Sequence, residues 1–134
     1  MEQVPDVRVL LVEDNAPDAT LIQEILSGLP IECHVTTVAT LKETKLVVDD
    51  GMFDLVILDL VLPNGQAEQA FDCVRAATDM PIVIVSGLGD QELVYSLVLR
   101  GAVDYLWKKW LSPARVEVAI RRAMERRIFD ERRT

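Results

Sequence analysis

Five short apolar runs alternate along the chain with longer segments whose apolar residues recur every three or four positions. A continuous apolar run is typical of a strand that is covered on both faces, and recurrence at helical spacing is typical of an amphipathic helix. Their alternation predicts one α/β domain, a parallel sheet with helices on both faces and right-handed crossovers. The expected strands are residues 7–12, 33–38, 53–60, 81–86 and 103–108.

Capping residues predict where the helices begin and end. Pro17 lies in the first turn of the first helix, and Thr40 with Glu43 forms a capping-box pattern at the second. Gly101 follows the fourth helix at the position where a left-handed turn is common, and Ser112 before Pro113 is a helix start. The other expected limits are Gly28 and Pro30, Gly51, Gln66 to Ala77, and Asp90 to Arg100.

The composition limits the class of protein. The chain has 134 residues, half of them hydrophobic, which is enough for one domain to bury a core without disulfides. Its formal net charge of −8 argues against a general nucleic-acid binder. No apolar run reaches the ~20 residues of a membrane span, and the start lacks a signal-peptide pattern. We therefore expect a cytoplasmic protein that does not bind a membrane.

Cysteine and histidine give little indication of a metal or redox site. Cys33 and Cys73 are far apart in the sequence. The only histidine, His34, has Cys33 as its one neighbouring cysteine. A zinc site needs about four ligands. We therefore expect two reduced thiols that pack as small apolar groups.

Polar residues stand where the expected strands end. Glu13 and Asp14 follow the first strand, Asp59 lies near the end of the third, Ser86 ends the fourth and Lys108 the fifth. Because the carboxyl ends of parallel strands meet at one edge, these side chains should converge there. Three carboxylates would repel one another, so a hard divalent cation such as Mg²⁺ is expected between them. A buried acid without such a role would cost about several kcal/mol.

Four motifs in order give the chain a family resemblance. RVLLVEDN, DLVILDLVLPNG, PIVIVSG and GAVDYLWK resemble the receiver domains of two-component signalling, and the match covers about Val7 to Ile128. The resemblance implies a single flavodoxin-like (βα)5 doubly wound sheet with strand order 2-1-3-4-5. It implies a receiver domain over residues 1–128, followed at 129–134 by a C-terminal helical extension or the start of a linker.

The resemblance also assigns roles to the residues at the strand ends. Asp59 would accept the phosphoryl group, and Mg²⁺ (or Mn²⁺) would be held by Glu13, Asp14, Asp59 and the backbone carbonyl of Val61. Ser86 and Lys108 would contact the phosphoryl oxygens, and Tyr105 would change rotamer on activation. The physical logic agrees, because a carboxylate is a competent nucleophile towards phosphorus once the charge between the two anions is neutralised.

The function implied is a phosphorylation-dependent switch rather than an enzyme with a turnover substrate. Its chemistry would be limited to self-phosphorylation and self-dephosphorylation. The implied partners are a histidine kinase or phosphotransfer protein and a downstream effector or C-terminal output module, with no direct contact to nucleic acid. A homodimer through the last strands and helices is an open alternative to a monomer.

The chain departs from the family after the active-site lysine, where receivers usually have a proline in a cis peptide. Here the sequence is Lys108-Lys109-Trp110, so we expect a trans bond and a rearranged loop. Lys109 could take the place of Lys108, although strand alternation favours Lys108. This departure resembles a proline-free subset found at the N-terminus of multidomain sensory proteins. The apolar residues Val61 and Leu88 beside the site predict slow self-dephosphorylation, because neither orients a water.

Other classes remain as alternatives. A receiver-like interaction module that works without phosphate would tolerate the missing proline. A phosphatase of the haloacid-dehalogenase type would need a second aspartate two residues after the nucleophile, where this chain has Val61. Flavodoxin-like nucleotide binding is disfavoured, because the first strand–helix turn is acidic and lacks a glycine-rich loop.

Overall fold

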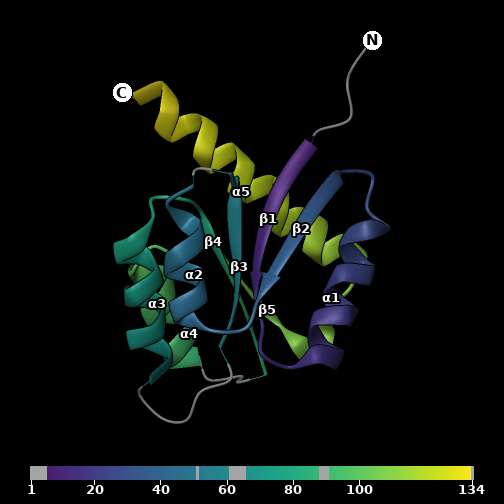
Figure 1. The fold of residues 1–134 in the computed structure, drawn as a ribbon, viewed down its shortest axis with the longest axis horizontal. Coiled ribbons are helices and arrows are strands. Elements are labelled where there is room, and N and C mark those ends of the chain that lie inside the picture. Colours follow the sequence, from purple (N-terminus) through teal and green to yellow (C-terminus); the bar gives the residue numbers. More distant parts are fainter. Residues whose placement is uncertain (1–5, 51, 61–65, 88–90, 134) are drawn as a thin grey trace.

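A computed structural model describes residues 6–50, 52–60, 66–87 and 91–133, and it describes the side chains of these residues except Gln66 and residues 128–133. The described chain forms five strands and five α-helices in alternation (Figure 1). The strands are β1 (Asp6–Val12), β2 (Glu32–Val38), β3 (Leu55–Asp59), β4 (Ile82–Ser86) and β5 (Asp104–Trp107). The helices are α1 (Ala16–Ser27), α2 (Leu41–Val48), α3 (Gln66–Ala77), α4 (Gln91–Leu99), the short 3₁₀ helix η1 (Lys108–Trp110) and α5 (Pro113–Arg133).

All strand pairs are parallel, and the order across the sheet is β2-β1-β3-β4-β5. Helices α1 and α5 cover one face and α2, α3 and α4 cover the other (Figure 1). The predicted doubly wound α/β fold and its strand order are therefore confirmed. In the register, Asp59 pairs with Val85 and Ser86 with Trp107, so the ends of β3, β4 and β5 lie side by side.

Alternate residues of the central strands supply two separate cores. In β3, Leu55 and Ile57 face α1 and α5, whereas Val56 and Leu58 face α2, α3 and α4. All four side chains are at most 1% exposed. Burial on both faces is the reason that this strand reads as a continuous apolar run in the sequence. Asp59 follows directly, where the strand reaches the edge of the sheet.

The capping predictions agree with the hydrogen bonds at the helix starts. The Thr40 hydroxyl accepts from the Glu43 backbone N–H at 3.0 Å, and the Ser112 hydroxyl accepts from that of Arg115 at 3.2 Å. Gly101 after α4 has φ +115°, which a residue with a Cβ adopts only under strain. Gly51 and Asp90, expected as helix limits, lie outside the described residues.

Several predicted boundaries differ from the observed ones by one or two residues, as in β3, which covers Leu55–Asp59 instead of 53–60. Helix α2 ends at Val48 with Asp49 as its C-cap. Lys108 is not the last residue of β5: the strand ends at Trp107, and Lys108 begins the 3₁₀ turn of η1. The described residues contain no cis peptide bond, so the Lys108–Lys109 bond is trans as predicted. Lys108–Trp110 form the 3₁₀ turn of η1, and the predicted rearrangement of this loop relative to other receivers stays a prediction.

An ion-pair cluster joins β5 to α5. Arg115 of α5 donates two hydrogen bonds to the buried Asp104 carboxylate, at 2.7 and 2.9 Å, and Arg122 lies 3.4 Å from it. Burial alone would raise the pKa of Asp104, but hydrogen bonds from Arg115 and from the Tyr105 backbone N–H bring that pKa below its ordinary value. Among the described residues Cys33 and Cys73 are unpaired, and no helix is long and apolar enough to cross a membrane.

Candidate functional site

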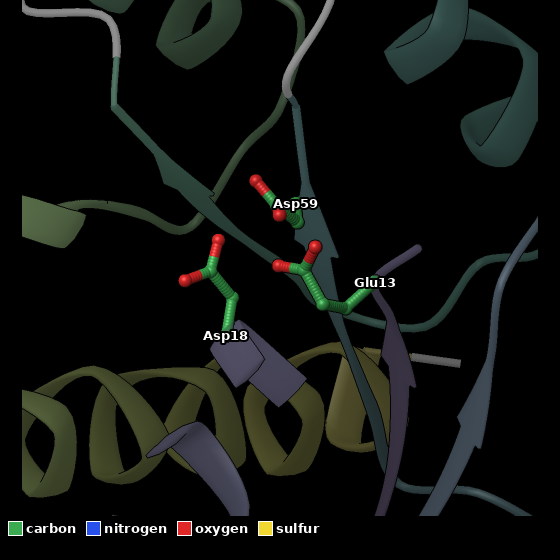
Figure 2. A group of neighbouring side chains, drawn as sticks. All are labelled: Glu13, Asp18 and Asp59. Atoms are coloured by element: carbon green, nitrogen blue, oxygen red, sulfur yellow. The ribbon is translucent and has the colours of Figure 1, made fainter. Parts of the chain in front are cut away.

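A lysine ammonium lies among three carboxylates at the carboxyl edge of the sheet. Lys108 Nζ is 2.5 Å from Asp59 Oδ2, 2.7 Å from Asp18 Oδ2 and 3.2 Å from Glu13 Oε2. Figure 2 shows the three acids directed into one shared space, Asp59 from the end of β3, Glu13 from the end of β1 and Asp18 from the start of α1. The structure therefore brings Glu13, Asp59 and Lys108 together as predicted.

Two of these acids are withdrawn from solvent. The side chain of Glu13 is 0% exposed and that of Asp59 is 1% exposed, whereas Lys108 is 18% exposed. Glu13 Oε1 accepts a hydrogen bond from the Asn15 backbone N–H at 3.0 Å. Glu13 Oε2 and Asp59 Oδ1 accept none from the described part of the chain. Two buried carboxylates thus face one ammonium, with oxygen atoms left over for a further cation.

A cavity of about 210 Å³ opens beside these oxygens. Glu13, Asp14 and Asp59 contribute its acidic part, and its apolar wall comes from the ends of β1 and β3, the start of α2 and Ala70 of α3. Asp14 is exposed and is not part of the group whose carboxylate oxygens lie within 4.8 Å of one another. Carboxylate oxygens and room for water are what Mg²⁺ requires, so these residues fit a hard divalent cation. The Val61 carbonyl lies outside the described residues, as does Leu88.

Ser86 is completely buried at the end of β4. Its hydroxyl donates a hydrogen bond to the Leu60 carbonyl at 2.8 Å, and the Leu60 N–H in turn donates to the Val85 carbonyl at 2.9 Å. Ser86 therefore lies at the same edge as Asp59, one residue beyond the strand partner of Asp59. In this arrangement the hydroxyl is directed at the backbone that follows Asp59.

Tyr105 belongs to a group of aromatic residues on the other side of β5. Its ring meets the Trp107 ring edge-on at 6.4 Å between centroids, and Trp107 meets Trp110 at 5.2 Å. These three rings line a cavity of about 390 Å³ together with Val94 of α4 and Arg115 of α5. The predicted switch residue thus lies away from the acids, in contact with the aromatic group. Lys109 is exposed, so it does not replace Lys108.

Asp18 is a site residue that was not predicted from the sequence. It is the third residue of α1, and its backbone N–H donates to the Asn15 side chain that caps the helix. Its position in the sequence could have indicated it, because the first turn of the helix after β1 begins at the edge of the sheet where the strands end. An acid in that turn is therefore a neighbour of Glu13 and Asp59 even though four residues separate it from Glu13.

Comparisons with known proteins identify the family of the chain. The profile of the response regulator receiver domain family matches residues 9–121. Two-component response regulator ORR23 of Oryza sativa subsp. indica is 32% identical over 113 residues, which is 83% of this chain and 16% of that protein. Two-component response regulator ARR10 of Arabidopsis thaliana is 30% identical over 118 residues, 87% of this chain and 21% of that protein. The chain therefore spans about a fifth or less of the length of these curated relatives.

Solved structures agree with the sequence comparison. The BeF3-activated N-terminal receiver domain of RstA from Klebsiella pneumoniae superposes with a TM-score of 0.73 at 25% identity, covering 87% of this chain and 97% of that one. NtrX from Brucella abortus gives a TM-score of 0.78 at 25% identity, covering 95% of this chain and 28% of that one. With the family profile spanning most of the described strands and helices, the chain belongs to the response regulator receiver domains of two-component signalling.

Proposed function

We propose that this receiver domain is a phosphorylation-dependent switch that accepts a phosphoryl group on Asp59 from a histidine kinase or phosphotransfer protein. The proposal rests mainly on the burial and the hydrogen-bond partners of the Asp59 carboxylate. It is buried at the end of a central strand, one oxygen lies 2.5 Å from the Lys108 ammonium, and the other has no hydrogen-bond donor among the described residues. A buried carboxylate with one oxygen unsatisfied is unusual outside a functional site.

The reaction is a transfer between two nucleophiles. An Asp59 oxygen attacks phosphorus, an O–P bond forms, and the P–N bond to the donor imidazole breaks with its electron pair returning to the imidazole nitrogen. Mg²⁺ (or Mn²⁺), held by Glu13, Asp14 and Asp59, would neutralise charge between the two anions when bound. The Lys108 ammonium already lies against Asp59 and supplies a point charge to the phosphoryl oxygens.

The switch follows from the position of Ser86. To donate to a phosphoryl group on Asp59, the Ser86 hydroxyl must leave the Leu60 carbonyl, to which it donates at 2.8 Å. Movement of Ser86 would leave space on the β5 side for Tyr105 to turn inward. A local change in charge would then alter the surface formed by Tyr105 and the two tryptophans.

The proposal also includes the partners of the domain and its place in a longer protein. Because the chain spans only 16–21% of the two curated relatives described above, we propose that a C-terminal output module or separate effector reads the switch. Residues 1–128 form the receiver, and residues 129–134 are a C-terminal helical extension or the start of a linker. The domain acts in the cytoplasm without contacting nucleic acid, has no turnover substrate, and can form a homodimer through its last strands and helices.

Intact-mass spectrometry after incubation with a small-molecule phosphodonor and Mg²⁺ tests the phosphorylation. We expect the wild-type chain to gain the mass of one phosphoryl group and to lose this ability when the metal is chelated. Asp59→Asn should gain nothing, while Asp79→Asn, which makes the same change at an exposed position after α3, should behave as the wild type. A wild type that stays unmodified with every donor would favour a phosphate-independent interaction module.

A further inference from the structure

Asp18 is held in a fixed place at the start of α1. The Asn15 side chain accepts from its backbone N–H at 3.0 Å, and the Asn15 carbonyl accepts from the Ala19 N–H at 2.9 Å. A carboxylate in the first turn is also favoured by the positive end of the helix dipole. From this fixed backbone the Asp18 side chain leaves the helix towards Glu13 and Asp59 (Figure 2). Its Oδ2 accepts a hydrogen bond from Lys108 Nζ at 2.7 Å.

Lys108 has three carboxylate partners, and in the proposed function they have different fates. Asp59 becomes an acyl phosphate, so its carboxylate is consumed in the reaction. Glu13 is one of the acids assigned to the metal, and its Oε2 lies in the ammonium's ion-pair range without a hydrogen bond. Asp18 does not accept the phosphoryl group and does not line the acidic cavity with Asp14, although its carboxylate lies within 4.8 Å of those of Glu13 and Asp59. It is therefore the partner that can keep its contact with the ammonium throughout the transfer.

We propose that Asp18 is a positioning residue of the phosphorylation site, which anchors the Lys108 ammonium beside the phosphoacceptor while Asp59 is converted from carboxylate to acyl phosphate. This inference rests on the proposed function. Lysine carries its charge on a flexible four-carbon stem, so an unanchored ammonium would lose orientation when Asp59 is esterified. An anchored one meets the phosphoryl oxygens without reorganisation, which is how a preorganised charge accelerates transfer.

The position of Lys108 after β5 makes such an anchor necessary. The residue lies in the 3₁₀ turn of η1 rather than in a hydrogen-bonded strand. Its side chain is 18% exposed, between the fully buried Glu13 and the partly exposed Asp18 at 38%. Without Asp18, the ammonium would have water in place of its partly exposed carboxylate partner.

The first test compares phosphorylation rates with a small-molecule phosphodonor and saturating Mg²⁺. Asp18→Asn keeps the size of the side chain and removes its charge, and we expect it to slow phosphorylation about fivefold. Asp18→Glu should recover part of the rate because it restores the carboxylate. Glu24→Gln, an equal charge change at an exposed position of the same helix, should leave the rate unchanged. An unaltered rate in Asp18→Asn would overturn the proposal.

A double-mutant cycle shows whether Asp18 acts through Lys108. In a Lys108→Gln background, Asp18→Asn should produce no further decrease, because the group that it positions is absent. A fivefold decrease in both backgrounds would mean that Asp18 acts directly on the metal or the fold, and the positioning role would be rejected.

The ammonium can also be observed without any phosphorylation. In ¹⁵N-labelled protein an ammonium held by carboxylates exchanges slowly enough to give an NMR signal, which we expect for Lys108 and assign by its absence in Lys108→Gln. Asp18→Asn should broaden or remove this signal, and Glu24→Gln should not. If the wild type is never phosphorylated, the proposed function fails while this spectrum still reports on the anchor. A signal that is unaffected in Asp18→Asn would refute the anchor itself.

Discussion

The charges around Lys108 determine the stability of the site as well as its reactivity. Two buried carboxylates, Glu13 and Asp59, face a single ammonium that is also shared with Asp18. Removing the ammonium would leave two buried charges uncompensated, which is far more destabilising than losing an exposed ion pair. Lys109 next to it is exposed and provides a control of the same residue type.

We therefore expect Lys108→Gln to lower the free energy of unfolding in metal-free buffer by about 3 kcal/mol. Lys109→Gln should change it by less than about 0.5 kcal/mol. Urea unfolding with and without Mg²⁺ measures both, and Mg²⁺ should restore much of the loss in Lys108→Gln because a bound cation replaces the missing charge. Equal stability of the two variants without metal would contradict the charge balance described here.

The Ser86 hydroxyl also contributes to the stability of the unphosphorylated domain. It satisfies the buried Leu60 carbonyl, so Ser86→Ala should lower the free energy of unfolding by about 1 kcal/mol. Ser27→Ala removes an exposed hydroxyl that donates to the Glu24 carbonyl, and should have a much smaller effect. Chemical denaturation of the two variants gives the comparison, and a neutral Ser86→Ala would mean that the Leu60 carbonyl finds another donor.

At the scale of elements, the contact between β5 and α5 depends on Asp104 and Arg115. The pKa of Asp104 lies below its ordinary value, because the hydrogen bonds from Arg115 and from the Tyr105 N–H outweigh the effect of burial. A group with a lowered folded-state pKa contributes its full stability above the ordinary aspartate pKa, and this contribution is lost as the pH falls through the lowered value.

Asp104→Asn should accordingly lower the free energy of unfolding by about 2 kcal/mol at neutral pH. The difference from the wild type should stay constant down to about pH 4 and shrink below it, because the wild-type carboxylate then becomes protonated. Thermal or urea unfolding of both proteins across this range provides the measurement. A difference that does not change with pH would mean that the charge of Asp104 is irrelevant to the contact.

The fold of the whole molecule follows closely from the sequence pattern, since burial on both faces of β3 and β4 leaves continuous apolar runs that other folds rarely produce. The same pattern placed Glu13, Asp59 and Lys108 at one edge, where the structure has them. It could not identify Asp18, because residue periodicity gives the face of a helix but not the reach of one side chain across the edge.

Local turns were the other feature that the sequence pattern left undetermined. The absence of proline after Lys108 predicted a trans peptide, which is present, and a changed loop, which stays a prediction. It did not predict that β5 would stop one residue earlier. A 3₁₀ turn of three residues depends on small local energies that have no periodic signature. The contact of Trp107 with Trp110 across this turn likewise depends on its conformation.

The proposed signal runs from Asp59 at the end of β3 past Ser86 at the end of β4 to Tyr105 in β5, and tryptophan fluorescence can report on it. Both tryptophans of the sequence, Trp107 and Trp110, lie in the aromatic group with Tyr105. If phosphorylation of Asp59 moves Ser86 and lets Tyr105 turn, the edge-on contact of Tyr105 with Trp107 must change.

Tryptophan emission should then shift when the phosphodonor is added with Mg²⁺, and should stay constant in Asp59→Asn. Tyr105→Ala should remain phosphorylated by intact mass but lose most of the emission change. Unchanged emission in a wild-type sample whose mass shows the phosphoryl group would mean that the signal does not reach β5.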